Sequence, residues 1–568
     1  MDKILALFIL AVSVFSFFIP ALSKKRASRL WRLFYLVPLI AAAATASFAG
    51  WDIGYIGVYL AAVILTFALY LNDGKKIRII SIAACALVTA SLVYMNVSPF
   101  YQKEDYAAYF DKGFNVMKEH YVLTEEKEID WDALYAKYRP RFEDAASKQD
   151  NTQNIKYWLQ FTQEFYDGHV DFSPAHEDEM TEARCGIFGN DYGLSLIKLS
   201  TGEYVAVNVE GSGASFNITE PGEDYDFLED YLREDAEENR LQLTDAGLHN
   251  GSIITSWDGK SPEELEKEVD VYLMSYPDKT NEEFYRPMYA AGKGGESIEI
   301  RFLDDNGNEH SVNAKALGPY YPRLVSSLKT LDNGVNISNL EWKELGPDTA
   351  MMRIDSMAYD TKSYSGADYT AMTDEIRENI LAYKEKGLKR LVIDLRRNGG
   401  GSPFMVKGVV CLFAPKGEHL LSYTTVINEK TASYERGADG KYTKGEAITY
   451  EGEDLLHDCE IILLVNAETV SAGDLICYLM SDYPNVTIMG FTGSNSSCQA
   501  VTAVSTGCGD ISFSAVPNLD ENAEPIIDSR ADHVRRVPID TIIPLTAEAV
   551  HAIYENGEDY LLDYAKNY

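Results

Sequence analysis

Hydrophobic positions divide the chain into a strongly apolar first hundred residues and a longer remainder in which apolar and polar positions alternate. The first part holds four uncharged apolar runs, each near the ~17–20 residues that a helix needs to cross ~30 Å of hydrocarbon. These runs lie at residues 4–22, 34–50, 55–71 and 79–95. The pattern predicts four transmembrane helices, and therefore a membrane anchor over residues 1–100.

Basic residues in the segments between these runs predict their orientation. The stretch "SKKRASRLWR", after the first run, carries five Lys/Arg and "NDGKKIR", after the third, carries three, whereas "GWDIG" carries none. Because positive loops stay in the cytoplasm, everything after Met95 is expected on the outer side of a cell membrane. The first run could be a signal peptide, but its basic exit and the later runs favour a retained helix. We therefore predict a multi-pass membrane protein with an extracytoplasmic C-terminal part and the lipid bilayer as one partner.

The periodicity changes twice after the apolar part. Apolar residues recur at three- and four-residue intervals from 101 to 184, which is typical of helices. From 185 to 316 the chain has short strand-like runs bounded by Gly, Asp and Asn. From 317 to 568 solid Val/Ile/Leu strands alternate with helical segments, which predicts a mostly parallel sheet covered on both faces. The predicted fold is multidomain: a four-helix transmembrane anchor, a helical domain, a β domain and an α/β core.

Charge is divided as unevenly as hydropathy. Residues 1–103 hold 10 Lys/Arg and 3 Asp/Glu, and the remainder holds 41 and 84, a formal charge of −43. So acidic a portion repels nucleic acid, which argues against a nucleic-acid partner. Six cysteines there are too few for a disulfide scaffold, although Cys498 and Cys508 could bridge a hairpin. No CxxC and no clustered His/Cys spacing occurs in the sequence, so a structural zinc site is not expected.

Two polar turns follow strands of the α/β region, at the edge where parallel sheets form their sites. The turn "RRNGGG" follows "KRLVIDL", and "AETVSAGD" follows "EIILLVN". The three glycines let backbone N–H groups approach an anion or a carbonyl closely. Taken alone, the glycine turn is more simply a tight connection between a strand and a helix.

The two turns together carry a family resemblance. "DLRRNGGG" followed some seventy residues later by "VNAETVSAGD" resembles the S41 peptidases, the tail-specific or C-terminal processing proteases, over roughly 104–568. The resemblance implies a ClpP/crotonase-like catalytic core. It also implies Ser471 as the nucleophile and the N–H groups of Ala472 and Gly400 as oxyanion donors, which stabilise a tetrahedral intermediate. Asp474 stands where the family more often has Glu, and is expected to cap or buttress the turn.

The β region resembles a PDZ domain in the order of its glycine-led loop and the strand that follows, "VNVEGSGA … AGLHNGSIITSWDG". In PDZ domains a strand edge accepts an extended or C-terminal peptide by β-addition. The predicted domains are a transmembrane anchor at 1–100, a helical domain at 101–184, a PDZ-like domain at 185–316 and an S41 peptidase domain at 317–568.

The sequence departs from the S41 pattern at the general base. Processing proteases carry a Lys roughly 25 residues after the serine, and here that count lands on Ser496. His169, in "EFYDGHVDFSP", resembles the base of the tricorn-type branch, where a His from the upstream segment activates the serine. An imidazole titrates near neutrality, which suits a group that takes and returns a proton. A Gly-His at a helix end is often structural, and His533 is a rival base.

A third, acidic residue is expected to orient the histidine or a neighbouring hydroxyl. In the tricorn-type branch it comes from the C-terminal segment, where this chain offers Asp528, Asp532 and Asp540. Asp532 is preferred on approximate spacing, and Asp540 is expected to help end a strand. Asp167 is too close to His169 in sequence to be an obvious orienting group, though it could fix the turn.

The sequence therefore predicts a serine-type endopeptidase that attacks peptide bonds with Ser471 and uses His169 as its base. The PDZ-like edge would select extended or C-terminal segments of extracytoplasmic protein substrates, and no metal or organic cofactor is implied. The alternative is a non-catalytic peptide-binding receptor, a pseudo-protease that kept the S41 scaffold and has no general base. The absence of the expected Lys favours this alternative.

Overall fold

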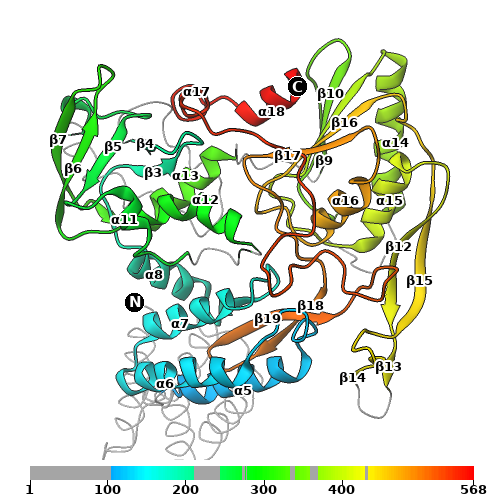
Figure 1. The fold of residues 1–568 in the computed structure, drawn as a ribbon, viewed down its shortest axis with the longest axis horizontal. Helices are drawn as coiled ribbons and strands as arrows, with labels where there is room; N and C mark the ends of the chain where they lie inside the picture. Colours follow the sequence, from blue (N-terminus) through cyan, green and yellow to red (C-terminus); the bar gives the residue numbers. More distant parts are fainter. Residues whose placement is uncertain are drawn as a thin grey trace, which may run out of the picture. The chain divides into compact units, whose positions relative to one another are not determined.

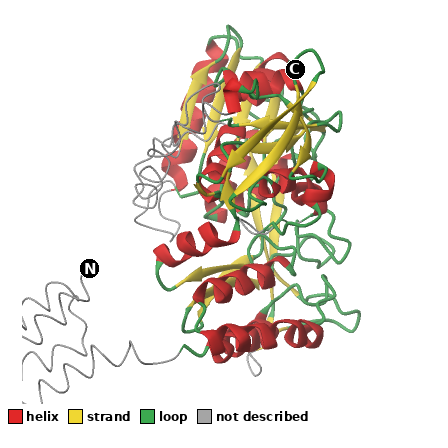
Figure 2. Cartoon of the chain, turned by 90° about the vertical axis from the view of Figure 1, so that its left-hand side faces the viewer, coloured by secondary structure: helices red, strands yellow, loops and turns green. Residues whose placement is uncertain are grey.

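The computed structural model describes residues 104–209, 243–271, 276, 278–332, 340–358, 369–428 and 433–568. The chain divides into two compact units, Met1–Glu104 and Asp105–Tyr568, and the elements below all belong to the second. Figure 1 shows these elements coloured along the chain, and Figure 2 shows them turned by 90° and coloured by secondary structure.

The structure corrects the prediction of a four-helix transmembrane anchor and of a multi-pass membrane protein. Across the described residues, no helix is long and apolar enough to cross a bilayer. Two of the longest there, α6 (Trp131–Lys148) and α14 (Tyr369–Glu385), carry several charged side chains, each of which costs about 2.5–3.5 kcal/mol at the centre of a span. The four apolar runs lie in residues 1–103, outside the described residues. Neither the anchor nor the lipid bilayer as a partner is retained.

Three helices open the described unit. Each begins after an aspartate whose side chain accepts a hydrogen bond from a backbone N–H of the first turn, a donor that has no partner within the helix. Their inner faces bury an aromatic cluster in which Phe110 stacks on Phe142 and Trp158 stacks on Phe172. The elements are α5 (Tyr106–His120), α6, α7 (Asn151–Gln163), the short strand β1 (Asp171–Pro174) and α8 (Glu177–Ile187).

A five-stranded antiparallel sheet follows, in the order β3-β4-β5-β6-β7. Its strands are β3 (Ser195–Lys198), β4 (Tyr204–Val207), β5 (Ile253–Trp257), β6 (Ser297–Leu303) and β7 (Glu309–Lys315). Helix α12 (Lys279–Ala290) packs against β3, with α11 (Pro262–Glu266) and α13 (Tyr321–Leu331) beside it. Among the described strands, β3 pairs only with β4 and so forms one edge of this sheet.

A six-stranded sheet forms the α/β core, in the order β20-β17-β16-β11-β10-β9. Only β9 is antiparallel to its neighbour, and the other pairs are parallel. The strands are β9 (Leu340–Glu344), β10 (Thr349–Ile354), β11 (Arg390–Asp394), β16 (Glu460–Leu464), β17 (Val486–Gly490) and β20 (Thr541–Ile542). Leu391 and Ile393 face one core, which α14, α15 (Pro403–Phe413) and α16 (Ala472–Met480) cover, while Val392 faces the other. Both faces are buried, as the unbroken apolar strands require.

One short sheet joins the first helices to the α/β core. Strand β1 pairs antiparallel with β19 (Gly509–Val516), which also pairs with β18 (Ala500–Ser505). In Figure 1 β18 and β19 lie beside α5 and α6, although more than 300 residues separate them in the chain. The loop just before β1 is thereby placed against the core, and this loop contains His169.

The other described elements are peripheral to the site. They are β2 (Asn190–Asp191), β8 (Gly318–Pro319), β12 (Gly417–Thr425), β13 (Ile427–Asn428), β14 (Ser433–Tyr434), β15 (Lys444–Gly452), α17 (Ala547–Val550), the π-helix η2 (His551–Glu555) and α18 (Tyr560–Asn567). The suggested Cys498–Cys508 bridge is absent, since both are free thiols, as are the other four cysteines within the described residues.

Candidate active site

Ser471 occupies the turn between β16 and α16 and has a backbone conformation that is unusual for a residue with a side chain. It is the N-cap of α16, with φ +62° and ψ −117°, a strained region that is found mainly where function demands it. Its N–H donates to Ser497 O at 2.8 Å, and its carbonyl accepts from Leu475 N at 3.0 Å. The side chain makes no capping hydrogen bond, so the half-buried hydroxyl does not bind the first turn of the helix.

The glycine turn after β11 packs directly against Ser471. Gly400 has φ +90°, and a Cβ there would lie 2.5 Å from Ser471 Cβ and 3.0 Å from Ala472 N. Ala472 is the first residue of α16, and its N–H therefore has no acceptor within the helix. Gly400 N–H donates to Asn398 Oδ1 at 3.0 Å. The structure brings together the three residues predicted to form the nucleophile and oxyanion turn, with the N–H of Gly400 directed at a side chain.

Gly400→Ala is expected to lower kcat/KM by about 10²–10³-fold, the loss that follows removal of one oxyanion donor. The added methyl group would meet Ser471 and Ala472, and φ +90° is strained for alanine. The measurement is steady-state peptide hydrolysis, with thermal unfolding to verify the fold. Gly399→Ala is the matched control, because a Cβ at that position has no atom within 4 Å. Equal losses in both variants would contradict the close approach.

The position where the S41 pattern has a lysine is occupied by Ser496. Ser496, at the expected lysine position, is fully buried, and its Oγ accepts from Arg536 N at 2.9 Å and Val537 N at 3.0 Å. It donates to Ile527 O at 3.3 Å. This hydroxyl fastens the C-terminal segment to the core, and no amine stands there to act as a base.

Asp474 supports the same segment from α16. Its Oδ2 accepts from Ser497 N at 3.0 Å, and the carbonyl of Ser497 in turn accepts from Ser471 N. Burial raises the pKa of the Asp474 carboxyl to about 7. The aspartate thus buttresses the nucleophile turn through Ser497, as its position after the serine suggested.

His169 is joined to this segment through its neighbour. Gly168 N donates to Ser497 Oγ at 2.8 Å, and a Cβ at Gly168 would collide with Asn495. Two hydrogen bonds through Ser497 therefore link the His169 loop to Ser471. Within the described residues, no hydrogen bond joins His169 to Ser471 directly, and His169 Nδ1 is enclosed without a partner. Burial lowers the pKa of the imidazole, and the nearby Asp167 partly opposes this.

Asp167 fixes the turn that carries His169. It is fully buried, and its Oδ1 accepts from His169 N at 2.9 Å. Its Oδ2 accepts from Tyr121 Oη at 3.0 Å and from Ser514 Oγ at 2.9 Å. Three donors from three parts of the chain hold this carboxylate, which accounts for the fixed position of the loop.

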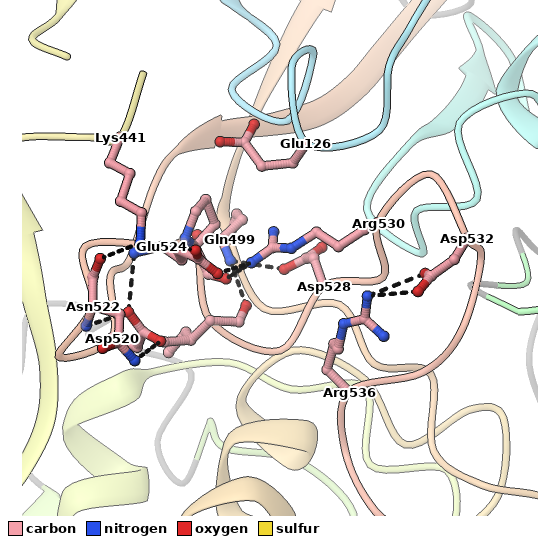
Figure 3. A network of polar contacts seen from close by, with 12 residues as sticks. Glu126, Lys441, Gln499, Asp520, Asn522, Glu524, Asp528, Arg530, Asp532 and Arg536 are labelled. Carbon is pink, nitrogen blue, oxygen red and sulfur yellow. Dashed lines mark hydrogen bonds and ion pairs between the residues drawn. The ribbon is translucent and has the colours of Figure 1, made fainter. Parts of the chain in front are cut away.

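Of the three C-terminal aspartates, only Asp528 belongs to the buried region. It is fully buried, and its Oδ2 accepts from Gln499 Nε2 at 2.7 Å and from Cys498 N at 3.1 Å, while Oδ1 has no partner. Burial, with a smaller contribution from Asp167, raises its pKa to about 7. Figure 3 shows Asp528 beside Gln499.

The preferred candidate Asp532 lies apart from this region. It is exposed and forms an ion pair with Arg536 at 2.9 Å, drawn as dashed lines in Figure 3. Asp540 pairs with β17, since its Oδ2 accepts from Ile488 N at 2.8 Å. The rival base His533 stacks on Tyr166, with ring centroids 3.8 Å apart, and makes no hydrogen bond to Ser471 within the described residues.

Sequence reasoning missed two groups that hold this site together, Ser497 and Lys127. Ser497 lies in the hydroxyl-rich stretch "SNSS", where nothing distinguishes it from its neighbours. Lys127 lies in "TEEKEID", a charged stretch that is typical of a solvated loop, yet its side chain is only 4% exposed. Their roles depend on contacts between distant segments.

Comparison with known proteins agrees with this geometry. Residues 348–509 match the model of peptidase family S41, and residues 102–153 match the tricorn protease C1 domain. The chain belongs to peptidase family S41 and is a serine-type peptidase. No curated protein matches the chain.

The solved structures that resemble this chain are distant in sequence. A crystal structure of a CPAF mutant is 11% identical, with a TM-score of 0.50, over 82% of this chain and 98% of that chain. The photosystem II D1 C-terminal processing protease is 14% identical over 79% of this chain and 97% of its own, with a TM-score of 0.30. Tricorn protease is 14% identical over 82% of this chain and 36% of its own, with a TM-score of 0.34. At these identities the likeness to the CPAF structure concerns the fold alone.

Proposed function

We propose that this peptidase is an endopeptidase that forms an acyl-enzyme on Ser471, with His169 as its general base. The observation that carries the proposal is the pair of hydrogen bonds through Ser497, which fastens the His169 loop to the backbone of Ser471. A structural histidine would not need a turn anchored to the nucleophile. The unpartnered Nδ1 and the lowered pKa of His169 also suit a base that is neutral near pH 7.

The reaction moves one proton back and forth. As Ser471 Oγ bonds to the substrate carbonyl carbon, its proton passes to His169 and the carbonyl electrons become an oxyanion. The N–H of Ala472 stabilises that oxyanion, together with Gly400 N–H, which would exchange Asn398 Oδ1 for it. Collapse of the intermediate releases the amine, which takes the proton from His169. Water then hydrolyses the ester by the same steps and restores Ser471.

The substrate class follows from the five-stranded sheet. Strand β3 has an unpaired edge among the described strands and packs beside α12. An extended peptide or a C-terminal segment would add there as a further strand, with main-chain hydrogen bonds supplying the affinity. The region 185–316 would then act as the PDZ-like domain, and 317–568 as the peptidase domain.

We propose Asp528 in place of Asp532 as the acidic residue of the site. Asp528→Asn is expected to lower kcat about 10²–10⁴-fold, because it removes the buried negative charge beside Asp167, the residue that fixes the His169 turn, whereas the exposed Asp532→Asn should remain near wild type. The wild-type rate should rise with pH around 7 as the buried carboxyl ionises. In Asp528→Asn this part of the pH–rate profile, its acid limb, should disappear. The rate should then fall only at lower pH, where His169 takes up a proton. A larger loss in Asp532→Asn would reverse the assignment.

The endopeptidase function is tested by incubating the full chain with α-casein, an unfolded protein. Cleavage by wild type within the substrate chain, absent in Ser471→Ala, supports it. Binding of casein without cleavage would instead favour the receptor alternative. Cleavage that persists in Ser471→Ala would reject the acyl-enzyme.

A further inference from the structure

Lys127 is a buried lysine in the connection between α5 and α6. Its side chain is 4% exposed, which is rare for a lysine unless it is paired. The ammonium group donates three hydrogen bonds of 2.9 Å, to Tyr166 O, Ser529 O and Ser529 Oγ. Because an ammonium group has three protons and no acceptor capacity, all of its donors are satisfied.

The partners of Lys127 flank two residues of the proposed site. Tyr166 immediately precedes Asp167, the residue that fixes the turn of His169. Ser529 immediately follows Asp528, and its Oγ also donates to Tyr166 O at 3.2 Å. The ammonium group thus joins the loop of the proposed base to the segment of the proposed acid, and it comes from a third part of the chain.

Charge reinforces this contact. Asp167 and Asp528 are both fully buried, and both attract the Lys127 ammonium group. Two carboxylates in one buried region repel each other, and without a cation one of them would take up a proton. The other ionisable groups that face these three residues are Tyr121, His169, Asp474, Cys498, Arg530 and Arg536. His533 also feels the charge of Lys127.

We propose that Lys127 is a positioning residue of the active site, which holds the His169 loop against the Asp528 segment and favours the ionised form of the buried carboxylates. The proposal rests on the proposed roles of His169 and Asp528. Lys127 is not itself the base, since its three protons are directed at Tyr166 and Ser529 and it makes no hydrogen bond to Ser471.

Kinetics of Lys127→Met in the full chain test this role. We expect kcat for a casein-derived peptide to fall by about 10–100-fold while KM changes less than about threefold, because substrate binding is untouched. The acid limb of the pH–rate profile should move to higher pH, since Asp528 loses its neighbouring cation and ionises later. The matched control is Lys118→Met, an exposed lysine paired with Asp132, which should behave as wild type.

The outcomes separate this proposal from the proposed function. An active wild type with unchanged kcat in Lys127→Met would overturn the positioning role alone, as would a loss of kcat without a shift of the acid limb. No Ser471-dependent cleavage by wild type would overturn both. If Lys127→Met does not fold, Ser529→Ala tests the positioning role instead, because it removes only one of the three acceptors of the Lys127 ammonium group. A several-fold loss of kcat there supports the proposal, and an unchanged kcat overturns it.

Discussion

Ser471→Ala is expected to reduce kcat by a factor on the order of 10⁵–10⁶, leaving only what the oxyanion turn and substrate binding contribute. The alanine methyl group occupies the same position as the serine Cβ, in a turn whose backbone contacts run through Ser497 O and Leu475 N. The hydroxyl makes no capping hydrogen bond. Folding should therefore be unaffected, and KM for peptide should change little.

Hydrolysis of a fluorogenic peptide with thermal unfolding of each variant measures this effect. Ser481→Ala is the matched control at the far end of α16, where the hydroxyl donates to Tyr478 O. It should retain the wild-type rate. If Ser471→Ala kept more than about a tenth of the wild-type rate, a serine nucleophile at this position would be excluded.

His169→Gln should cause the second largest loss, on the order of 10⁴–10⁶ in kcat, because removing the base of such a unit costs nearly as much as removing the serine. The same change at His533, which stacks on Tyr166, should cost less than about tenfold, since no base is lost. Kinetics of the two variants, with circular dichroism as the check on folding, compare the rival histidines directly.

The pKa of His169 also predicts the direction in which the rate changes with pH. A base must be neutral, and burial lowers the pKa of His169 below its ordinary value of about 6.5. His169 should therefore hold no proton at neutral pH and should limit the rate only as pH falls below that value. A limb that His169 causes would vanish in His169→Gln. A full rate in His169→Gln with loss in His533→Gln would assign the base to His533, whereas a rise in rate near pH 7 that persists in His169→Gln is expected from Asp528.

The two turns of the candidate site could be predicted from the sequence because they are local. A glycine at φ +90° and a serine at the start of a helix are encoded in "RRNGGG" and "VSAGD", each within a few residues. The parallel strands before them read as solid apolar runs, since both faces of the sheet are buried. Local pattern and tertiary structure agree at these points.

The acidic residue could not be chosen from the sequence. Asp528 and Asp532 are four residues apart in a segment without helix or strand, where no periodicity tells an inward side chain from an outward one. Burial of Asp528 depends on Gln499 and Cys498, and exposure of Asp532 follows its pairing with Arg536. Spacing alone therefore led to Asp532, which lies outside the buried region.

Lys127 and the apolar N-terminal runs show two other limits of sequence patterns. A lysine among glutamates predicts a solvated loop, whereas in the structure hydrogen bonds from Val122 N to Ser514 O and from Ala531 N to Glu126 O hold this loop against the core. Hydropathy led to a four-span anchor, whereas the described residues contain no helix suited to a bilayer. The burial of Lys127 thus depends on which segments meet, which the local composition around it does not indicate.

The most direct test of the account is covalent labelling of the full chain with a fluorophosphonate, followed by peptide mapping in a mass spectrometer. Such a probe phosphonylates a serine only where a neighbouring base and oxyanion donors activate it. We predict a single label on Ser471 in the wild type and at least about a hundredfold slower labelling in His169→Gln. No label on Ser471 in the folded wild type, or equally fast labelling without His169, would contradict a Ser471–His169 peptidase.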